Sequence, residues 1–218
     1  MTRLSDYLYY EEPGIQLYCG DCREVLPLVS EHASLLLTDP PYGLGERWHG
    51  GGTWGKAVKY KEARAWDQAP PDDALLQMVL GCADHAIIWG GNYFRLHVSR
   101  GWLAWVKSDR LATLADVELA WTSFDRPSKV YESVRNVERP RHGHATEKPI
   151  RLMRWCMGYS RLPMGSECLV LDPFVGSGST VVAAKASGCR AIGVEIEPKY
   201  CEIAVKRLRQ EALPLGLK

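Results

Sequence analysis

The sequence predicts an open α/β fold, in which a mostly parallel central sheet is covered by helices on both faces. Short apolar runs typical of strands alternate along the chain with amphipathic runs typical of helices. The chain has 218 residues, of which 46% are hydrophobic, and this is enough to form one globular core. No repeat or linker interrupts the pattern, so we expect a single domain over residues 1–218.

The expected elements follow from where apolar residues recur. Strands are predicted at residues 15–18, 34–38, 86–89, 102–106, 117–121, 168–171 and 191–195. Helices are predicted at residues 22–29, 72–82, 149–158, 179–187 and 198–211, the last with Pro198 in the first turn, where its missing N–H is tolerated. The segments 44–67 and 125–141 show no period, and we expect them to be loops; the first is long enough to be a lid or a substrate loop.

Charge and cysteine content narrow the class of protein. The chain has 27 Lys and Arg against 26 Asp and Glu, a balance that neither requires nor excludes a nucleic-acid partner. It contains no apolar run long enough to span a membrane and no apolar signal segment at its start. Seven cysteines, an odd number, suit reduced thiols, so we expect a soluble cytoplasmic protein.

Basic residues cluster in the two predicted loops, which makes these loops candidates for binding nucleic acid. Solvated loop charge explains either cluster about equally well when it is taken alone. The candidate contacts are Arg47, Lys56, Lys59, Lys61 and Arg64 in 44–67, and Arg135, Arg139 and Arg141 in 125–141.

A metal site is not expected. Cys19 and Cys22 form a C-x-x-C pair, and His142 and His144 lie much later in the chain. A zinc site normally shows a second closely spaced pair with the usual ligand spacing, and these histidines stand far from the cysteines in sequence.

A glycine-rich turn in residues 169–180 has the pattern of a cofactor-binding loop. An apolar strand leads through Gly176 and Gly178 into a helix, whose N-terminus offers unpaired N–H groups. Glu195 ends the next strand, where a carboxylate is placed to accept hydrogen bonds from both hydroxyls of a ribose. Because Gly178 is not followed by the third glycine of a dinucleotide motif, the pattern favours a nucleoside without a pyrophosphate, most commonly S-adenosylmethionine. A plain tight turn remains the alternative.

Asp39, Pro40, Pro41 and Tyr42 follow the predicted strand 34–38 at its carboxyl end, where open α/β sheets place their chemistry. An exocyclic amine of a base is a poor nucleophile because its lone pair is delocalised into the ring. Hydrogen bonds accepted by the Asp39 carboxylate and the Pro40 carbonyl orient that lone pair toward a methyl donor. Tyr42 offers an aromatic face on which a flipped base can stack. An acidic turn stiffened by prolines, with a purely structural role, remains the alternative.

These motifs resemble the amino-methyltransferases of DNA, in the permuted group where D-P-P-Y precedes F-x-G-x-G. Residues 17–22 resemble that family's G-D element, in which the acidic residue holds the cofactor's adenine, and residues 144–149 resemble its H-x-T-x-K-P element beside the methionine end. Residues 192–196 resemble its ribose-binding strand. The resemblance implies a Rossmann-like, circularly permuted methyltransferase fold. It implies cofactor contacts from Asp21, Cys22, Asp39, Thr146, Lys148, Asp172, Phe174, Gly176, Ser177, Gly178 and Glu195.

The resemblance also implies the activity. S-adenosylmethionine is the expected cofactor, S-adenosylhomocysteine its product, double-stranded DNA the substrate and a homodimer the expected assembly. In this family D-P-P-Y goes mostly with N6 of adenine and S-P-P-Y with N4 of cytosine, so Asp39 favours adenine. N4-cytosine methylation, a non-catalytic nucleoside-binding module and a nicotinamide oxidoreductase remain alternatives. A cytosine-C5 enzyme is not expected, because it needs a cysteine nucleophile, generally from a Pro-Cys pair, and no proline in this chain is directly followed by a cysteine.

Two further segments resemble the family. Residues 89–94 resemble its glycine-containing strand end, where small residues leave room for a base, although a plain turn explains them equally well. Lys107, in the segment 105–107, and Glu118 resemble positions of phage-type members, and no role is assigned to them from sequence.

Overall fold

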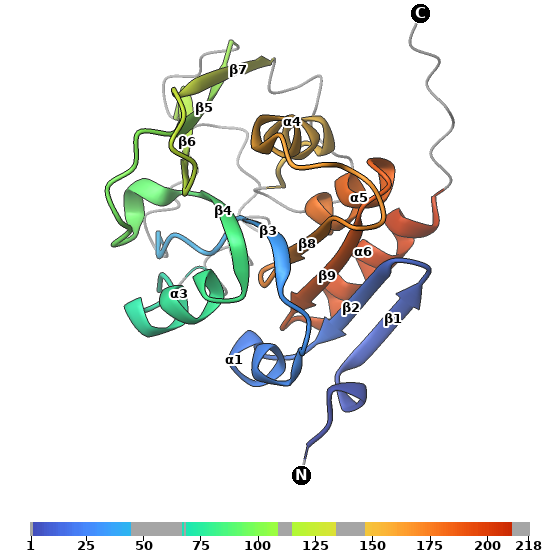
Figure 1. Cartoon of the computed structure of the whole chain (residues 1–218). Coiled ribbons are helices and arrows are strands. Elements are labelled where there is room, and N and C mark those ends of the chain that lie inside the picture. Colours follow the sequence, from blue (N-terminus) through green and yellow to red (C-terminus); the bar gives the residue numbers. More distant parts are fainter. Residues whose placement is uncertain (1, 45–66, 68, 109–114, 134–146, 211–218) are drawn as a thin grey trace, which may run out of the picture.

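The computed structural model describes residues 2–44, 67, 69–108, 115–133 and 147–210. Within these ranges a nine-stranded sheet crosses the molecule (Figure 1). Its strands are β1 (Leu8–Glu12), β2 (Ile15–Cys19), β3 (Ala33–Thr38), β4 (Ala83–Trp89), β5 (Trp102–Lys107), β6 (Val117–Thr122), β7 (Lys129–Ser133), β8 (Leu169–Asp172) and β9 (Arg190–Glu195). The α-helices are α1 (Cys22–Val25), α3 (Asp73–Leu80), α4 (Ile150–Ser160), α5 (Ser179–Ala186) and α6 (Pro198–Arg209).

The sheet is mixed but mostly parallel. Its strand order is β1-β2-β9-β8-β3-β4-β6-β5-β7, and the five strands from β2 to β4 are parallel to one another. Strand β1 is antiparallel to β2, and β6 is antiparallel to both of its neighbours. The carboxyl ends of the five parallel strands therefore meet at one edge, where the predicted site residues lie.

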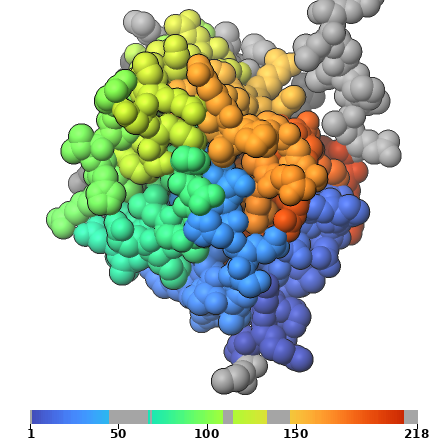
Figure 2. Space-filling model, in the orientation of Figure 1, coloured from blue at the N-terminus to red at the C-terminus, as the bar shows by residue number. Residues whose placement is uncertain are grey.

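Helices cover both faces of the sheet, as predicted. One buried cluster packs side chains of α4, α5 and α6 against one face, and a second packs those of α1 and α3 against the other (Figure 1). The space-filling view shows segments from the start, middle and end of the chain packed side by side (Figure 2). The predicted open α/β fold is confirmed.

The local sequence explains where the helices begin and why one of them is short. Asp21 and Asp72 cap α1 and α3, accepting hydrogen bonds from the backbone N–H of Arg23 and Leu75. The helix expected at 22–29 is α-helical only to Val25 and continues as a 3-10 turn, because Pro27 lacks the N–H that an α-helix needs there.

Two edge strands were missed from sequence. Strand β1 alternates weakly and is largely exposed, and β7 is a polar strand in the segment expected to be a loop. The prediction that 125–141 is loop throughout is therefore wrong, since Lys129–Ser133 pairs in parallel with β5. Arg126, in the same segment, donates hydrogen bonds to the carbonyl oxygens of Tyr159 and Ser160, which join it to the end of α4.

In the described part of the chain, no helix is long and apolar enough to cross a membrane.

A buried ion pair joins α6 to the segment that precedes α4. The Arg207 guanidinium pairs with the Glu147 carboxylate, and both side chains are almost fully buried. Arg207 also donates hydrogen bonds to the carbonyl and hydroxyl oxygens of Ser177, at 2.7 Å and 3.0 Å from Nη1. The pair thus holds three separate segments at the carboxyl edge of the sheet.

Replacing Arg207 with methionine should lower the free energy of unfolding by about 3–5 kcal/mol, because the Glu147 carboxylate is left buried without its counter-charge. Urea denaturation at pH 7 measures this. The control is Lys206→Met, which removes an exposed i,i+4 partner of Glu202 and should cost less than about 1 kcal/mol. Adding Glu147→Leu to Arg207→Met should restore part of the loss. A cost below about 1 kcal/mol for Arg207→Met alone would contradict the role given to this pair.

Candidate active site

The site is built where the parallel strands end. Thr38, the last residue of β3, donates from Oγ1 to Asp172 Oδ1 at 2.6 Å, which ties the end of β3 to the end of β8. Cys19 at the end of β2 is paired in register with Glu195 at the end of β9. The segments that follow these strands, which carry Asp39 and Asp21, are thus brought to one edge.

Asp39 and Tyr42 contact each other directly. The Tyr42 hydroxyl donates to Asp39 Oδ1 at 2.5 Å, and the Lys148 ammonium donates to Asp39 Oδ2 at 2.5 Å. Lys148 Nζ lies 3.2 Å from the Tyr42 hydroxyl. The Asp39 side chain is 21% exposed, so the carboxylate still reaches the open edge. Both of its oxygens have a partner in this conformation.

A chain of alternating charges continues from Asp39 into the sheet. Lys148 Nζ lies 3.1 Å from Glu118 Oε2, and Lys107 pairs with the other oxygen of Glu118. Lys148 was expected to contact the cofactor and Lys107 and Glu118 had no assigned role, but the structure places all three behind Asp39. Trp105 and Glu118 are register partners in the antiparallel pair β5–β6, and the Lys107 ammonium lies over the Trp105 ring. Sequence spacing carries no signal for this pairing.

Burial and charge act in opposite directions on these groups. Burial raises the pKa of Asp39 above its ordinary value, although the Lys148 charge opposes the rise. Burial also disfavours the charged form of Glu118, but the charges of Lys148 and Lys107 outweigh it and lower the pKa of Glu118 to about 2. Burial by itself lowers the pKa of Lys148, and the Asp39 and Glu118 carboxylates outweigh it, so that pKa lies above its ordinary value. At neutral pH Lys148 and Glu118 are therefore charged.

The glycines after β4 make room for Tyr42. Gly90 has φ +71°, and a Cβ atom there would lie 2.1 Å from Cε1 of the Tyr42 ring. The Tyr42 ring stacks on Tyr93 with centroids 4.9 Å apart and an interplanar angle of 14°. A Cβ at Gly91 would lie 2.4 Å from Trp121 Cβ. The expected room for a base beside these glycines is thus filled by Tyr42 and Trp121 in this conformation.

The predicted nucleoside half of the site is acidic. Asp21 accepts from the Arg23 N–H at 2.8 Å and its side chain remains 34% exposed. Glu195 accepts from the N–H groups of Gly176 and Glu197, at 2.7 Å and 2.9 Å. Carboxylates therefore stand just after β2 and at the end of β9. They can accept hydrogen bonds from ribose hydroxyls and an amino group, and their negative charge favours a positive sulfonium and disfavours a pyrophosphate. These residues fit S-adenosylmethionine better than a dinucleotide.

Other residues expected at the cofactor face the protein interior. The space beside Gly178 is occupied by Ala204 of α6, whose Cβ would lie 2.8 Å from a Cβ added there. The Ser177 hydroxyl contacts Arg207. Cys22 is buried at the start of α1, and burial raises the pKa of its thiol to about 12. The Phe174 N–H donates to Asp172 Oδ1 at 3.1 Å.

Asp67 is not among the site residues predicted from sequence. It connects the two ends of the segment expected to be a lid. Its carboxylate accepts from the N–H groups of Gly43 and Leu44, at 2.7 Å and 3.2 Å. The two ends of 44–67 are thereby joined next to Tyr42. The remaining expected site residues lie outside the described ranges: Arg47, Lys56, Lys59, Lys61, Arg64, Arg135, Arg139, Arg141 and Thr146.

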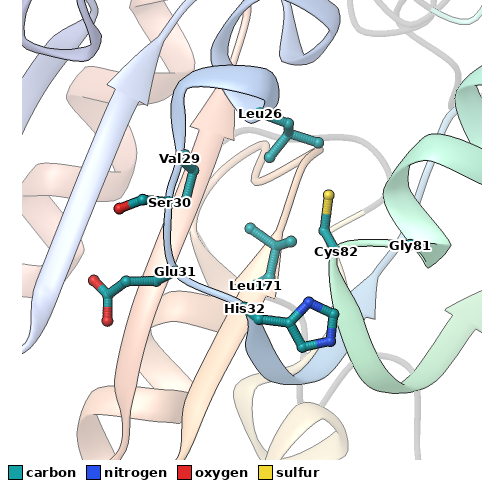
Figure 3. Close-up of a pocket in the computed structure, with 8 residues that line it drawn as sticks. All are labelled: Leu26, Val29, Ser30, Glu31, His32, Gly81, Cys82 and Leu171. Carbon is teal, nitrogen blue, oxygen red and sulfur yellow. The ribbon is translucent and has the colours of Figure 1, made fainter.

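A cavity of about 180 Å³ lies away from this edge, between the segments that lead into β3 and β4 (Figure 3). His32, Cys82 and Leu171 are among its lining residues. Cys82 donates to the Met78 carbonyl within α3, and His32 pairs with Asp84. Among the residues with described positions, no group of three His, Cys, Asp or Glu side chains is placed to hold a metal ion.

Solved structures with a similar fold include a DNA methyltransferase and a complex with S-adenosylmethionine. The cytosine-N4-specific PvuII DNA methyltransferase superposes with a TM-score of 0.60 at 16% identity, covering 92% of this chain and 88% of its own. The M1.HpyAVI complex with S-adenosylmethionine superposes with a TM-score of 0.57 at 19% identity, covering 89% and 99%. Residues 97–206, half of the chain, match the N6/N4 family model described as DNA methylase. The chain belongs to this DNA methylase family.

Curated relatives share shorter stretches of sequence. The type II methyltransferase M.HinfI of Haemophilus influenzae is 42% identical over 73 residues, which cover 34% of this chain and 20% of that protein. The type II methyltransferase M.HpaI of Haemophilus parainfluenzae is 26% identical over 248 residues, which cover 90% and 74%. The match to M.HinfI therefore spans about a fifth of that relative's length.

Asp172 should make folding stability depend on pH. Burial raises its pKa from 3.8 to about 6, against hydrogen bonds that include those from Thr38 and Phe174. Between these values the folded protein binds a proton that the unfolded chain has released, so the contribution of Asp172 to stability falls as pH rises from 4 to 7. The full change is about 3 kcal/mol.

Asp172→Asn keeps an acceptor oxygen and removes this titration. Urea denaturation of both proteins at pH 4 and pH 7 measures their free energies of unfolding. The value for the variant, relative to the parent, should rise by up to about 3 kcal/mol between pH 4 and pH 7. Equal pH dependence in the two proteins would exclude the raised pKa.

Proposed function

We propose that this protein transfers a methyl group from S-adenosylmethionine to N6 of an adenine flipped out of double-stranded DNA. The observation that carries the proposal is the Asp39 carboxylate, held at the carboxyl edge of β3 between Lys148 and Tyr42. It lies at the same edge as the acidic, nucleoside-type half of the site. Membership of the DNA methylase family and the fold of the M1.HpyAVI complex with S-adenosylmethionine support the assignment.

In this proposal the cofactor lies over the glycine turn. Glu195 holds the ribose hydroxyls and Asp21 the adenine amino group, and Gly176 supports the turn from its left-handed conformation at φ +53°. The bound cofactor supplies an electrophilic methyl group on a positive sulfonium. The carboxylates of Asp21 and Glu195 favour that positive charge.

The acceptor half of the site orients the exocyclic amine of the base. Asp39 Oδ1 and the Pro40 carbonyl accept the two N–H groups and aim the nitrogen lone pair at the methyl group. Asp39 Oδ1 is bonded to the Tyr42 hydroxyl in the structure, so the amine must displace that hydroxyl when the base enters. Tyr42 then offers its ring as a stacking face, with Tyr93 behind it.

N4-cytosine methylation is the second candidate, because the PvuII enzyme is cytosine-N4-specific by name and shares the fold. Adenine is preferred because this chain carries Asp39 where cytosine-N4 members carry serine. The permuted motif order, the basic DNA contacts in 44–67 and 125–141, and the homodimer remain parts of the proposal. The missing third glycine after Gly178 and the match to the DNA methylase family weigh against the nicotinamide alternative.

The product assay distinguishes these candidates. The protein is incubated with unmethylated DNA and labelled S-adenosylmethionine, and the digested nucleosides are identified by mass spectrometry. We expect label in N6-methyladenine, and loss of at least about 1000-fold in rate for Asp39→Ala, because both orientation and an acceptor are removed. The control is Asp84→Ala, an exposed carboxylate at the opposite end of β4, which should leave the rate unchanged. Label in N4-methylcytosine would overturn the base assignment, and an unaffected Asp39→Ala rate would overturn the mechanism.

Tyr42 variants separate its hydroxyl from its ring. Tyr42→Phe keeps the stacking face and leaves no hydroxyl to displace, so kcat/KM for DNA should stay within about threefold or rise. Tyr42→Ala removes stacking worth about 1–3 kcal/mol, so kcat/KM should fall about 5- to 150-fold. Steady-state kinetics at constant salt measure both. An equal loss in the two variants would assign the effect to the hydroxyl and contradict the stacking role.

A further inference from the structure

We infer that Glu118 is a positioning residue for the acceptor site: through Lys148 it keeps the Asp39 carboxylate aimed at the incoming amine. This inference rests on the proposed function. It concerns residues that lie on β5 and β6 and contact neither half of the substrate site directly in the structure.

Lys148 is held by three acceptors, which matches the three N–H groups of an ammonium. Its Nζ lies 2.5 Å from Asp39 Oδ2, 3.1 Å from Glu118 Oε2 and 3.2 Å from the Tyr42 hydroxyl. Its side chain is only 3% exposed. Because a tetrahedral ammonium has fixed donor directions, the position of Glu118 decides where the N–H toward Asp39 points.

Glu118 is itself fixed from the other side. Lys107 pairs with Glu118 Oε1, which leaves Oε2 for Lys148. Lys107 and Glu118 belong to the paired strands β5 and β6, so the rigid sheet sets their separation. The orientation of the Asp39 side chain therefore depends on β5 and β6 as well as on β3.

Glu118 also sets the charge that Asp39 experiences. With it, two carboxylates balance two ammonium groups along the chain Asp39, Lys148, Glu118, Lys107. Without its charge, two buried ammonium groups face the single carboxylate of Asp39. Among the described residues, the other titratable groups that face this cluster are Tyr42 after β3, Tyr93 after β4, Cys156 on α4 and Asp172 at the end of β8.

The direction of the effect on pH dependence follows from these charges. The Glu118 carboxylate raises the pKa of Asp39 and the pKa of Lys148. Glu118→Gln should therefore lower both, and the acid and alkaline limbs of the rate profile should move toward lower pH. Lys107→Met removes a positive charge instead and should move the acid limb toward higher pH.

The test measures methyl transfer to DNA from pH 5 to pH 10 for the parent, Glu118→Gln and Lys107→Met. The matched control is Glu202→Gln, an exposed glutamate on α6. We expect kcat of Glu118→Gln to fall about 100-fold, as for a misplacement of about 1 Å at the reacting centre. Its KM for DNA and its Kd for S-adenosylmethionine should change less than about threefold, while the control matches the parent. If the limbs of the pH–rate profile lie at the same pH in both variants as in the parent, the inference is overturned, even if kcat is lower.

A second readout does not depend on turnover. The carboxyl carbon of Asp39, assigned by comparison with Asp39→Asn in protein labelled with ¹³C aspartate, is titrated by NMR in the parent and both variants. Opposite displacements of this titration in Glu118→Gln and Lys107→Met support the inference even if the parent does not methylate DNA, in which case only the proposed function fails. A titration that is the same in all three overturns the inference while leaving the proposed function standing.

Discussion

The ammonium group of Lys148 is the point on which the acceptor site depends. A buried positive charge is tolerated only when hydrogen-bonded counter-charges surround it, and here Asp39, Glu118 and the Tyr42 hydroxyl supply them. These three residues come from segments after β3 and within β6 that are far apart in sequence. Their meeting at one ammonium couples the carboxylate proposed to hold the base to the antiparallel part of the sheet.

Glu147, the residue before Lys148, points toward α6 instead of toward Asp39. Glu147 pairs with Arg207 of α6, while the backbone carbonyl of Lys148 accepts from the Ser179 hydroxyl at the start of α5, at 2.6 Å. Two adjacent residues of opposite charge thus connect the glycine turn to the acceptor carboxylate. The Glu147–Arg207 pair is buried, and the buried Lys148 ammonium pairs with the partly exposed Asp39. Solvent therefore screens the interactions that fix the relative placement of the two halves of the site only weakly.

The glycines around the site serve packing as well as any ligand. Gly90 accommodates the Tyr42 ring and Gly178 accommodates Ala204, and both have positive φ. The sequence predicts instead that Gly178 contacts the cofactor and that the segment 89–94 leaves room for a base. The closeness of Tyr42 to Gly90 matters most, because it places the phenol hydroxyl on Asp39 and leaves the acceptor oxygen occupied until a base displaces it.

The sequence by itself determined the fold class, the seven inner strands and the position of Asp39 and Glu195 at strand ends. These follow from apolar periodicity and from turn residues, which act over a few neighbouring positions. It did not reveal the edge strands β1 and β7, whose residues are too exposed to show a period. The tertiary structure alone decided that Lys107, Glu118 and Lys148 stand behind Asp39. Such ion pairs depend on strand order and register, which bring distant residues together without leaving a pattern along the chain.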